Sequence, residues 1–204
     1  MVKIYGHPAS TCTRKVLMTL AETQTPFEMV VVDFAKGEHK TEEHLRRQPF
    51  GRIPALDDDG YALFESRAMC RYLNERAGGK LVPGDMKARG KMEQWISIEM
   101  SEFSGHAMKF VYKHVFKREQ DAAVLEAATK ALETTCAFMD RELAKNQYVA
   151  GADFSIADIG FMPYIEYAMG TPAKEIFTKH PHLMSWWGRI GERPTWRKVA
   201  GRAG

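Results

Sequence analysis

The sequence predicts a mixed α/β domain followed by an all-helical domain. Strand and helix patterns alternate along residues 1–77, whereas strand patterns disappear beyond residue 84. The glycine-rich segment 78–84 between the two regions is typical of a linker. We therefore expect domains at 1–77 and 85–204, joined by the linker 78–84. A chain of 204 residues is long enough for both domains to bury a core.

The first domain begins with a strand–helix–strand unit. Val2–Tyr5 and Phe27–Val32 are apolar and rich in β-branched or aromatic residues, as strands are. Between them the spacing of apolar residues predicts a helix over about Ser10–Thr23. Its apolar face consists of Val16, Leu17, Leu20 and Ala21. A right-handed crossover would make the two strands parallel neighbours.

The second half of this domain is a hairpin followed by a helix. Ile53–Leu56 and Ala62–Phe64 are short strands, and the turn 57–60 between them is too short for anything but an antiparallel pair. Ser66–Arg76 then shows helical periodicity. The complete order is βαβ, then a loop or an irregular helix over the polar stretch 35–48, then ββα. It predicts a four-stranded mixed sheet with helices on both faces. This is the thioredoxin-like arrangement.

Long amphipathic patterns dominate the second domain. They predict helices over 86–118, 122–144, 155–167 and 181–192. Ser155 and Asp158 have the spacing of a capping box, in which each side chain satisfies a backbone N–H of the first turn. We expect replacement of Asp158 to cost about 1 kcal/mol or more, as the loss of a helix cap does.

Composition excludes several functional classes. The net charge of +3 is small and scattered, which argues against nucleic-acid binding. No apolar run is long enough to span a membrane, and the N-terminus lacks a signal-peptide pattern. The three cysteines have no close spacing, and the pair His180 and His182 has no third ligand nearby, so we expect free thiols, no metal site and a cytoplasmic protein.

The segment Gly6–Arg14 follows the first strand and opens the first helix. Backbone N–H groups are unpaired at such a place, and the helix dipole favours negative charge. A hydroxyl here has two interpretations: Ser10, Thr11 or Thr13 caps the helix, or a hydroxyl donates a hydrogen bond to a bound thiolate. This segment alone leaves both interpretations open.

Two further segments favour a peptide ligand. A proline that opens a strand beside a ligand site is often cis in this fold, and Pro54 follows Arg52 and Ile53. The backbone of Ile53 would then face outward and could pair with an extended peptide. Glu65 and Ser66 place a carboxylate and a hydroxyl at a second helix N-terminus. Together these features suit a short peptide that carries an amine, carboxylates and a thiol.

Several motifs resemble the glutathione transferases, and most closely the phi class of plants and its bacterial relatives. These motifs are Gly6-His-Pro-Ala-Ser-Thr11, Gly37-Glu-His-Lys40, Gln48-Pro-Phe-Gly-Arg-Ile-Pro-Ala-Leu56 and Leu63-Phe-Glu-Ser-Arg-Ala68. Tyr148–Gly151, Ser155–Asp158 and Glu192–Pro194 match as well. The resemblance extends over nearly the whole chain. It implies that glutathione is a co-substrate, that no other cofactor is needed, and that small hydrophobic electrophiles are the second substrate.

The resemblance also implies a role for individual residues. Ser10 would activate the thiol, and the glutathione-binding residues would be His39, Lys40, Arg52, Ile53, Pro54, Glu65 and Ser66. Of these, His39 and Lys40 would bind the glycine carboxylate, the backbone of Ile53 the cysteinyl unit, and Glu65 with Ser66 the γ-glutamyl end. The family usually has glutamine where this chain has Arg52, so only the backbone role is carried over there. For His39 a solvated loop position, and for Glu65 a plain helix cap, are the structural alternatives.

Aromatic residues complete the expected site. Phe34, Tyr112 and Phe116 are candidates for an apolar electrophile pocket, although core packing explains each of them equally well. Phe50 lies in a proline–glycine loop, and in the family an aromatic at this place inserts into a partner subunit. The resemblance therefore implies a homodimer.

Alternative functions remain open at this point. Conjugation could be accompanied by glutathione-dependent reduction of hydroperoxides. Cys12, near the start of the first helix, could instead serve a thiol transferase, although it is two positions away from Ser10 and points to another side of the helix. Cys70 lies among core residues and is expected to be inert. A non-catalytic binding protein with the same fold is the third alternative.

Overall fold

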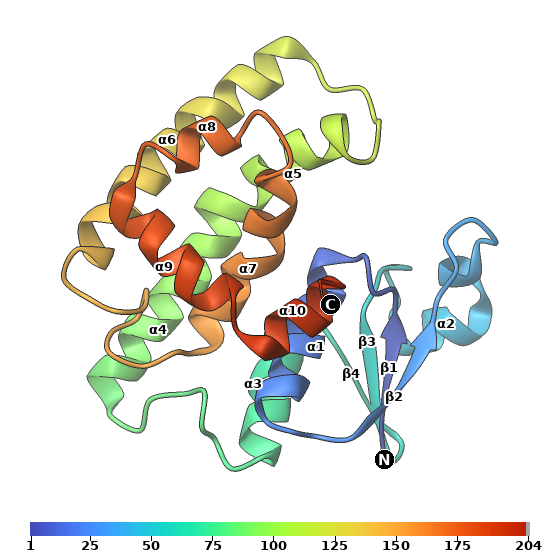
Figure 1. Ribbon diagram of the computed structural model, residues 1–204. Helices are drawn as coiled ribbons and strands as arrows, with labels where there is room; N and C mark the ends of the chain where they lie inside the picture. The colour runs from blue at the N-terminus through green and yellow to red at the C-terminus, as the bar shows by residue number, and fades with distance from the viewer. Residues whose placement is uncertain (203–204) are drawn as a thin grey trace. The chain divides into compact units, whose positions relative to one another are not determined.

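The computed structural model describes residues 1–202, which divide into two compact units (Figure 1). The first unit covers Met1–Lys80, and the second begins at Leu81. The first unit contains a four-stranded sheet, and the described part of the second contains helices and no strand. The predicted fold class, a thioredoxin-like α/β domain followed by an all-helical domain, is thus confirmed.

The sheet of the first unit has the strand order β2-β1-β3-β4. β1 and β2 are parallel, and β3 is antiparallel to both of its neighbours, so the sheet is mixed as predicted. The four strands are β1 (Val2–Gly6), β2 (Phe27–Val31), β3 (Ala55–Asp58) and β4 (Tyr61–Phe64). β3 begins two residues later than expected because the Ile53–Pro54 segment precedes the ladder, to which a proline cannot donate.

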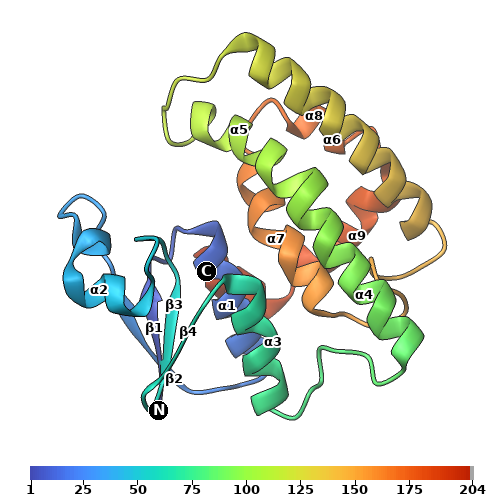
Figure 2. The same ribbon diagram turned by 180° about the vertical axis from the view of Figure 1, so that it is seen from behind.

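Helices cover both faces of this sheet. α1 (Thr11–Glu22) and α3 (Ser66–Arg76) pack against each other on one face, and α2 (Glu42–Arg47) lies on the other (Figures 1 and 2). The polar stretch 35–48, expected to be a loop or an irregular helix, contains α2 and the preceding 3₁₀ turn Glu38–Lys40. α2 has six residues and buries only one of them, so no apolar stripe marks it.

The second unit consists of helices α4 to α10. Their bounds are α4 (Met86–Ile98), α5 (Ser104–His114), α6 (Ala122–Leu143), α7 (Ile156–Ala168), α8 (Lys174–Phe177), α9 (Pro181–Gly191) and α10 (Pro194–Ala200). The short helices α8 and α10 were not predicted. The expected helix over 86–118 is interrupted by a π-helical turn at Glu99–Phe103. There the buried Glu99 packs against Gly160 of α7, where an added Cβ would lie 3.4 Å from its carboxylate.

α7 is held at its N-terminus by the predicted capping box. The Ser155 hydroxyl accepts the N–H of Ala157, and Asp158 Oδ2 accepts the N–H of Ser155 at 2.9 Å. The other oxygen, Oδ1, accepts the N–H of Val149 and the indole N–H of Trp186 at 3.1 and 2.8 Å. Asp158 is fully buried, so this single carboxylate connects α7 to the segment before it and to α9.

Candidate functional site

Three segments that carry predicted site residues join the sheet at the same end of its strands. Tyr5 near the end of β1, Ala55 at the start of β3 and Phe64 at the end of β4 lie side by side in the register. A Cβ added to Gly6 would be 3.5 Å from Cβ of Pro54, which shows how closely the first two segments approach. The topology of the sheet therefore brings the start of α1, the proline segment and the start of α3 together.

Ser10 is the N-cap of α1. Its backbone is extended (φ −75°, ψ 128°), and its Oγ accepts the N–H of Thr13 at 3.3 Å. A second bond, from the Ser10 N–H to the carbonyl of His7 at 2.9 Å, closes the turn. The structure therefore bears out the capping interpretation. The same contact uses a lone pair of Oγ and leaves the hydroxyl proton available for donation, so the two interpretations are compatible.

His39 is ordered by an aromatic stack. Its ring lies 4.1 Å from that of Phe34, with an interplanar angle of 12°. The turn between them is closed by Glu38, whose carboxylate accepts the N–H of Asp33 at 2.7 Å. Nδ1 of His39 is buried and has no hydrogen-bond partner among residues 1–202. Phe34 remains 48% exposed, so one of its faces supports His39 while much of the ring is open to solvent.

Gly51 connects this turn to the proline segment. It has a left-handed backbone (φ +60°), and an added Cβ would lie 2.8 Å from Nζ of Lys40 and 3.0 Å from the carbonyl oxygen of His39. A side chain at position 51 would displace both residues. The glycine therefore lets the exposed Lys40 and the half-buried His39 lie directly against the loop that leads to Ile53 and Pro54.

The peptide bond Ile53–Pro54 is cis, as expected for this fold. Pro54 is buried and Ile53 is half-buried, whereas the Arg52 side chain is exposed. Neither the N–H nor the C=O of Ile53 forms a hydrogen bond with another residue of 1–202. The backbone of Ile53 therefore has its donor and its acceptor available.

Glu65 and Ser66 form the junction of β4 and α3. Glu65 has a left-handed φ of 70°, uncommon for a residue with a side chain, and its carboxylate makes no capping bond to the helix. Ser66 is 4% exposed and begins α3. Backbone conformations of this kind are often found at ligand sites, where the surrounding structure holds them in place.

Tyr112 and Phe116 belong to the second unit. Their rings are 6.3 Å apart, and Phe116 also lies 6.0 Å from the ring of Tyr167. The guanidinium of Arg118 lies over Tyr112 at 5.3 Å. Tyr167 and Arg118 were not singled out from the sequence. Phe116 is 41% exposed, so this aromatic cluster is only partly buried.

Sequence reasoning also missed two buried polar residues, His44 and Gln48. They are 3% and 2% exposed. Gln48 Oε1 accepts the N–H groups of Phe50 and Arg52 at 2.8 and 3.1 Å, and His44 Nε2 lies 2.8 Å from the Arg52 carbonyl oxygen. Both residues lie in the polar stretch that was expected to be a loop or an irregular helix. No sequence signal marked them, because polar residues in a polar stretch are mostly exposed.

The three cysteines differ in their surroundings. Cys12 is partly exposed, whereas Cys70 and Cys136 are buried. Burial raises the pKa of the Cys70 thiol to about 11 and that of Cys136 to about 12. Both buried thiols are therefore protonated at neutral pH, as expected for packing residues.

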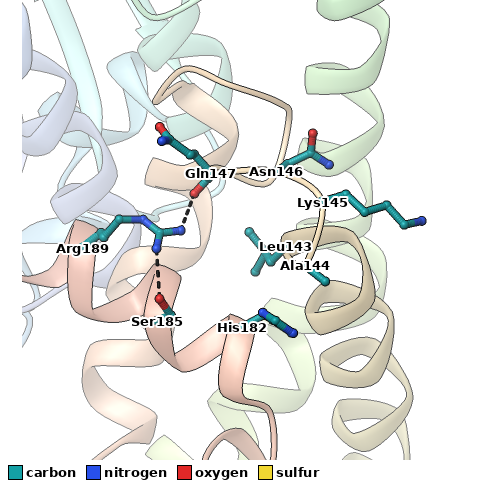
Figure 3. Close-up of a pocket in the computed structure, with 8 residues that line it drawn as sticks. All are labelled: Leu143, Ala144, Lys145, Asn146, Gln147, His182, Ser185 and Arg189. Atoms are coloured by element: carbon teal, nitrogen blue, oxygen red, sulfur yellow. Dashed lines mark hydrogen bonds between the residues drawn. The ribbon is translucent and has the colours of Figure 1, made fainter.

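The second unit has a surface pocket of about 300 Å³ between the end of α6 and α9 (Figure 3). Arg189 spans it, donating to the Gln147 carbonyl at 2.7 Å and to Ser185 Oγ at 3.0 Å. The lining residues are Leu143, Ala144, Lys145, Asn146, Gln147, His182, Ser185 and Arg189. None of them was predicted as a site residue, and most are exposed, so we assign the pocket no part in the chemistry.

Neither a metal cluster nor a membrane span is found in residues 1–202. No group of three or more His, Cys, Asp or Glu residues in this range could hold a metal ion. Within the same range, no helix has both the length and the apolar character needed to cross a membrane.

The sheet topology and the helical second unit define a two-part protein with a thioredoxin-like N-terminal unit. A family model for the glutathione S-transferase N-terminal domain matches residues 1–75, and one for the C-terminal domain of the same family matches residues 102–194. Glutathione S-transferase F7 of Arabidopsis thaliana is 36% identical over 205 residues, which cover 97% of this chain and 98% of that relative. This chain therefore belongs to the glutathione S-transferase family.

Solved structures agree with this assignment. Glutathione transferase F7 from Populus trichocarpa has a TM-score of 0.93 to this chain at 33% identity, with both chains covered completely (100%). Glutathione S-transferase I from maize, solved in complex with an atrazine glutathione conjugate, has a TM-score of 0.91 at 29% identity and covers 98% of this chain and 97% of its own. The F7 proteins of Arabidopsis thaliana and Populus trichocarpa are both plant F-type members, in agreement with the phi-like motifs.

Proposed function

We propose that this protein conjugates the thiolate of glutathione to hydrophobic electrophiles, and that Ser10 stabilises the thiolate. The observation that carries the proposal is the Ser10 hydroxyl at the N-terminus of α1, with its lone pair engaged by Thr13 and its proton free to donate. The helix N-terminus adds a favourable field for the anion. The maize relative supports the choice of reaction, since it was solved with a glutathione conjugate.

The proposed reaction is a substitution or an addition at carbon. The glutathione sulfur forms a bond to the electrophilic carbon, and in a substitution the leaving group, such as chloride, departs with the bonding electron pair. We assign the glycine carboxylate to His39 and Lys40, the cysteinyl unit to the backbone of Ile53 beside Pro54, and the γ-glutamyl end to Glu65 and Ser66. The Arg52 side chain is exposed, which supports a backbone role at this position.

The contribution of Ser10 can be estimated. Lowering a thiol pKa from about 8.5 to roughly 6.5 raises the thiolate fraction at neutral pH about 25-fold. Nucleophilicity falls with basicity, however. A Brønsted slope of about 0.4–0.5 lowers the reactivity of each thiolate roughly 6- to 10-fold. The net gain is a few-fold, so holding the electrophile in position must supply most of the acceleration. We assign this role to the partly exposed aromatic side chains Phe34, Tyr112 and Phe116.

Reduction of organic hydroperoxides is a second proposed activity of the same thiolate. Two glutathione molecules are oxidised to the disulfide, and the hydroperoxide is reduced to an alcohol and water. Because Ser10 provides a hydroxyl rather than a reactive thiol, we expect glutathione itself to supply both electrons. We also propose a cytoplasmic homodimer in which a partner subunit covers Phe50, whose side chain is 61% exposed beside Phe64.

The test compares Ser10→Ala, Ser10→Thr and Cys12→Ala. Ser10→Ala should bind S-methylglutathione nearly normally and lose most activity with glutathione and 1-chloro-2,4-dinitrobenzene. In the complex of Ser10→Ala with glutathione, the pKa of the thiol, measured by thiolate absorbance, should rise by about one to two pH units. This corresponds to a loss of about 1.4–2.7 kcal/mol in the stabilisation of the thiolate. The sign follows because removal of the donor destabilises the thiolate and leaves the neutral thiol almost unaffected.

The two other variants are the controls. Ser10→Thr keeps a hydroxyl and should retain part of the effect, whereas Cys12→Ala should remain active. Full activity in Ser10→Ala together with its loss in Cys12→Ala would instead support a thiol transferase. Glutathione binding without turnover of any electrophile or hydroperoxide in the wild type would support a non-catalytic binding protein.

A further inference from the structure

The buried side chain of His44 holds the backbone beside the proposed glutathione site. His44 lies in α2 and is 3% exposed, and its Nε2 is 2.8 Å from the carbonyl oxygen of Arg52. A carbonyl oxygen can only accept a hydrogen bond, so Nε2 must carry a proton. The Arg52 side chain itself is exposed, which means that the fold fixes the main chain at this position and leaves the guanidinium outside.

The geometry of the peptide unit carries this contact to Ile53. The C=O of Arg52 and the N–H of Ile53 belong to one planar trans peptide, in which the two groups point in opposite directions. A hydrogen bond that fixes the carbonyl toward His44 therefore aims the Ile53 N–H away from it. That N–H has no partner among residues 1–202.

Gln48 strengthens the arrangement on the same inner side of the loop. Its carboxamide oxygen accepts the N–H groups of Phe50 and Arg52, at 2.8 and 3.1 Å, and its side chain is 2% exposed. His44 lies in α2, and Gln48, with an extended backbone (φ −139°, ψ 92°), is the residue that follows the helix, so both side chains reach the loop from the C-terminal part of one short segment. Two buried side chains thus fix the peptide units that precede Ile53.

We propose that His44 is a positioning residue for glutathione binding, because it orients the Ile53 N–H toward the cysteinyl carbonyl of the ligand. The proposal rests on the proposed function, which assigns the cysteinyl unit to Ile53. His44 acts through the backbone and does not touch the ligand. An N–H held in the binding orientation before the ligand arrives loses less entropy on binding, which increases affinity.

The principal test is the affinity of the full-length protein for S-methylglutathione, measured by calorimetry. His44→Phe keeps a ring of similar size but removes the donor, and should weaken binding about tenfold. The KM for glutathione should rise by the same factor, while the KM for 1-chloro-2,4-dinitrobenzene and kcat change less than about twofold. His44→Gln, whose amide can donate, should recover part of the affinity.

Arg47→Lys is the matched control. Arg47 stacks over the ring of Tyr5 at 4.1 Å, so this variant loosens the attachment of α2 to the sheet without removing the bond to Arg52 and without changing the charge. Its affinity for S-methylglutathione should stay within about twofold of the wild type. An equal loss in both variants would show that His44 only supports α2, and unchanged affinity in His44→Phe would also overturn the proposal.

A measurement on the wild type is independent of whether a variant folds. Nitrogen-15 NMR of the His44 ring should show the proton on Nε2, and the Ile53 amide resonance should shift downfield when S-methylglutathione binds. A proton on Nδ1 alone, or an Ile53 amide that does not respond, would overturn the positioning role. Failure of the wild type to bind S-methylglutathione would instead overturn the proposed function itself.

Discussion

Asp158 provides the sharpest stability prediction. Its buried carboxylate accepts four hydrogen bonds, two from Ser155 (N–H and Oγ–H) and one each from Val149 and Trp186. The change Asp158→Ala removes all four acceptor contacts and leaves the donors inside the second unit. The sequence motif by itself predicts the loss of a helix cap, about 1 kcal/mol.

The structure predicts a larger effect. A buried donor left without a partner costs about 1–3 kcal/mol, and water that enters the vacated space offsets part of this. Burial raises the pKa of Asp158, with the hydrogen bonds from Trp186, Val149 and Ser155 acting in the opposite direction, so removing the carboxylate also relieves a desolvation cost. We therefore expect Asp158→Ala to lower the free energy of unfolding by about 3–5 kcal/mol. For a chain of this length the midpoint of thermal unfolding should fall by about 10 °C.

The assay is urea unfolding followed by circular dichroism, which does not depend on Trp186 as a reporter. Asp153→Ala removes an exposed carboxylate five residues earlier and should change the free energy of unfolding by less than about 0.5 kcal/mol. Ser155→Ala, which loses the serine side of the capping box, should cost about 1 kcal/mol. If Asp158→Ala costs no more than Ser155→Ala, the contacts to Val149 and Trp186 contribute nothing, and the reasoning is refuted.

Two further predictions concern association and pH. Phe50→Ser should convert the proposed dimer to monomers at micromolar concentration, as measured by sedimentation velocity. Tyr61→Ser changes another exposed aromatic residue of the first unit and should leave the dimer intact. A monomeric wild type would contradict the proposed dimer. Burial acts to raise the pKa of Asp58, but hydrogen bonds from Tyr72 (2.8 Å) and Arg76 (2.6 Å) outweigh it and hold the pKa below its ordinary value. The resulting stability is present above the unfolded pKa of about 3.9 and is lost as the pH falls through the folded value. We therefore expect the free energy of unfolding, measured with urea at a series of acidic pH values, to fall less steeply with decreasing pH in Asp58→Asn than in the wild type. Equal slopes of this free energy against pH would contradict the assignment.

The order of the main elements could be predicted because each has a local signature. The apolar alternation of the strands, the short turn at 57–60 and the amphipathic periods of the long helices are all visible within a few residues. Elements without such a signature were missed or, for α2, expected only as a loop or an irregular helix. α2 buries a single residue, and α8 has only four residues, so neither shows a periodic apolar face. The π-helical turn at Glu99–Phe103 was also missed, and its buried Glu99 packs against Gly160 of α7, a contact between segments far apart in the sequence.

The candidate site was predictable to a similar degree. Ser10 and Ser66 lie at helix starts, where a hydroxyl has a chemical meaning that the sequence carries, and the motifs around His39 and Ile53 resemble a family. The alternatives for Ser10 were a cap or a thiolate donor. The structure makes the cap explicit and is compatible with the second role, so Ser10→Ala is the experiment that decides its contribution.

By itself, the sequence determined the two-part organisation and the Ser155–Asp158 capping box, because these depend on residues within a few positions of one another. Only the tertiary structure decided which polar side chains are buried and what they hold. Asp158 meets Trp186, 28 positions away, and His44 meets the carbonyl of Arg52 because the chain after α2 folds back beneath it. A buried polar group must find a partner, and the partner is set by packing between segments rather than by local pattern.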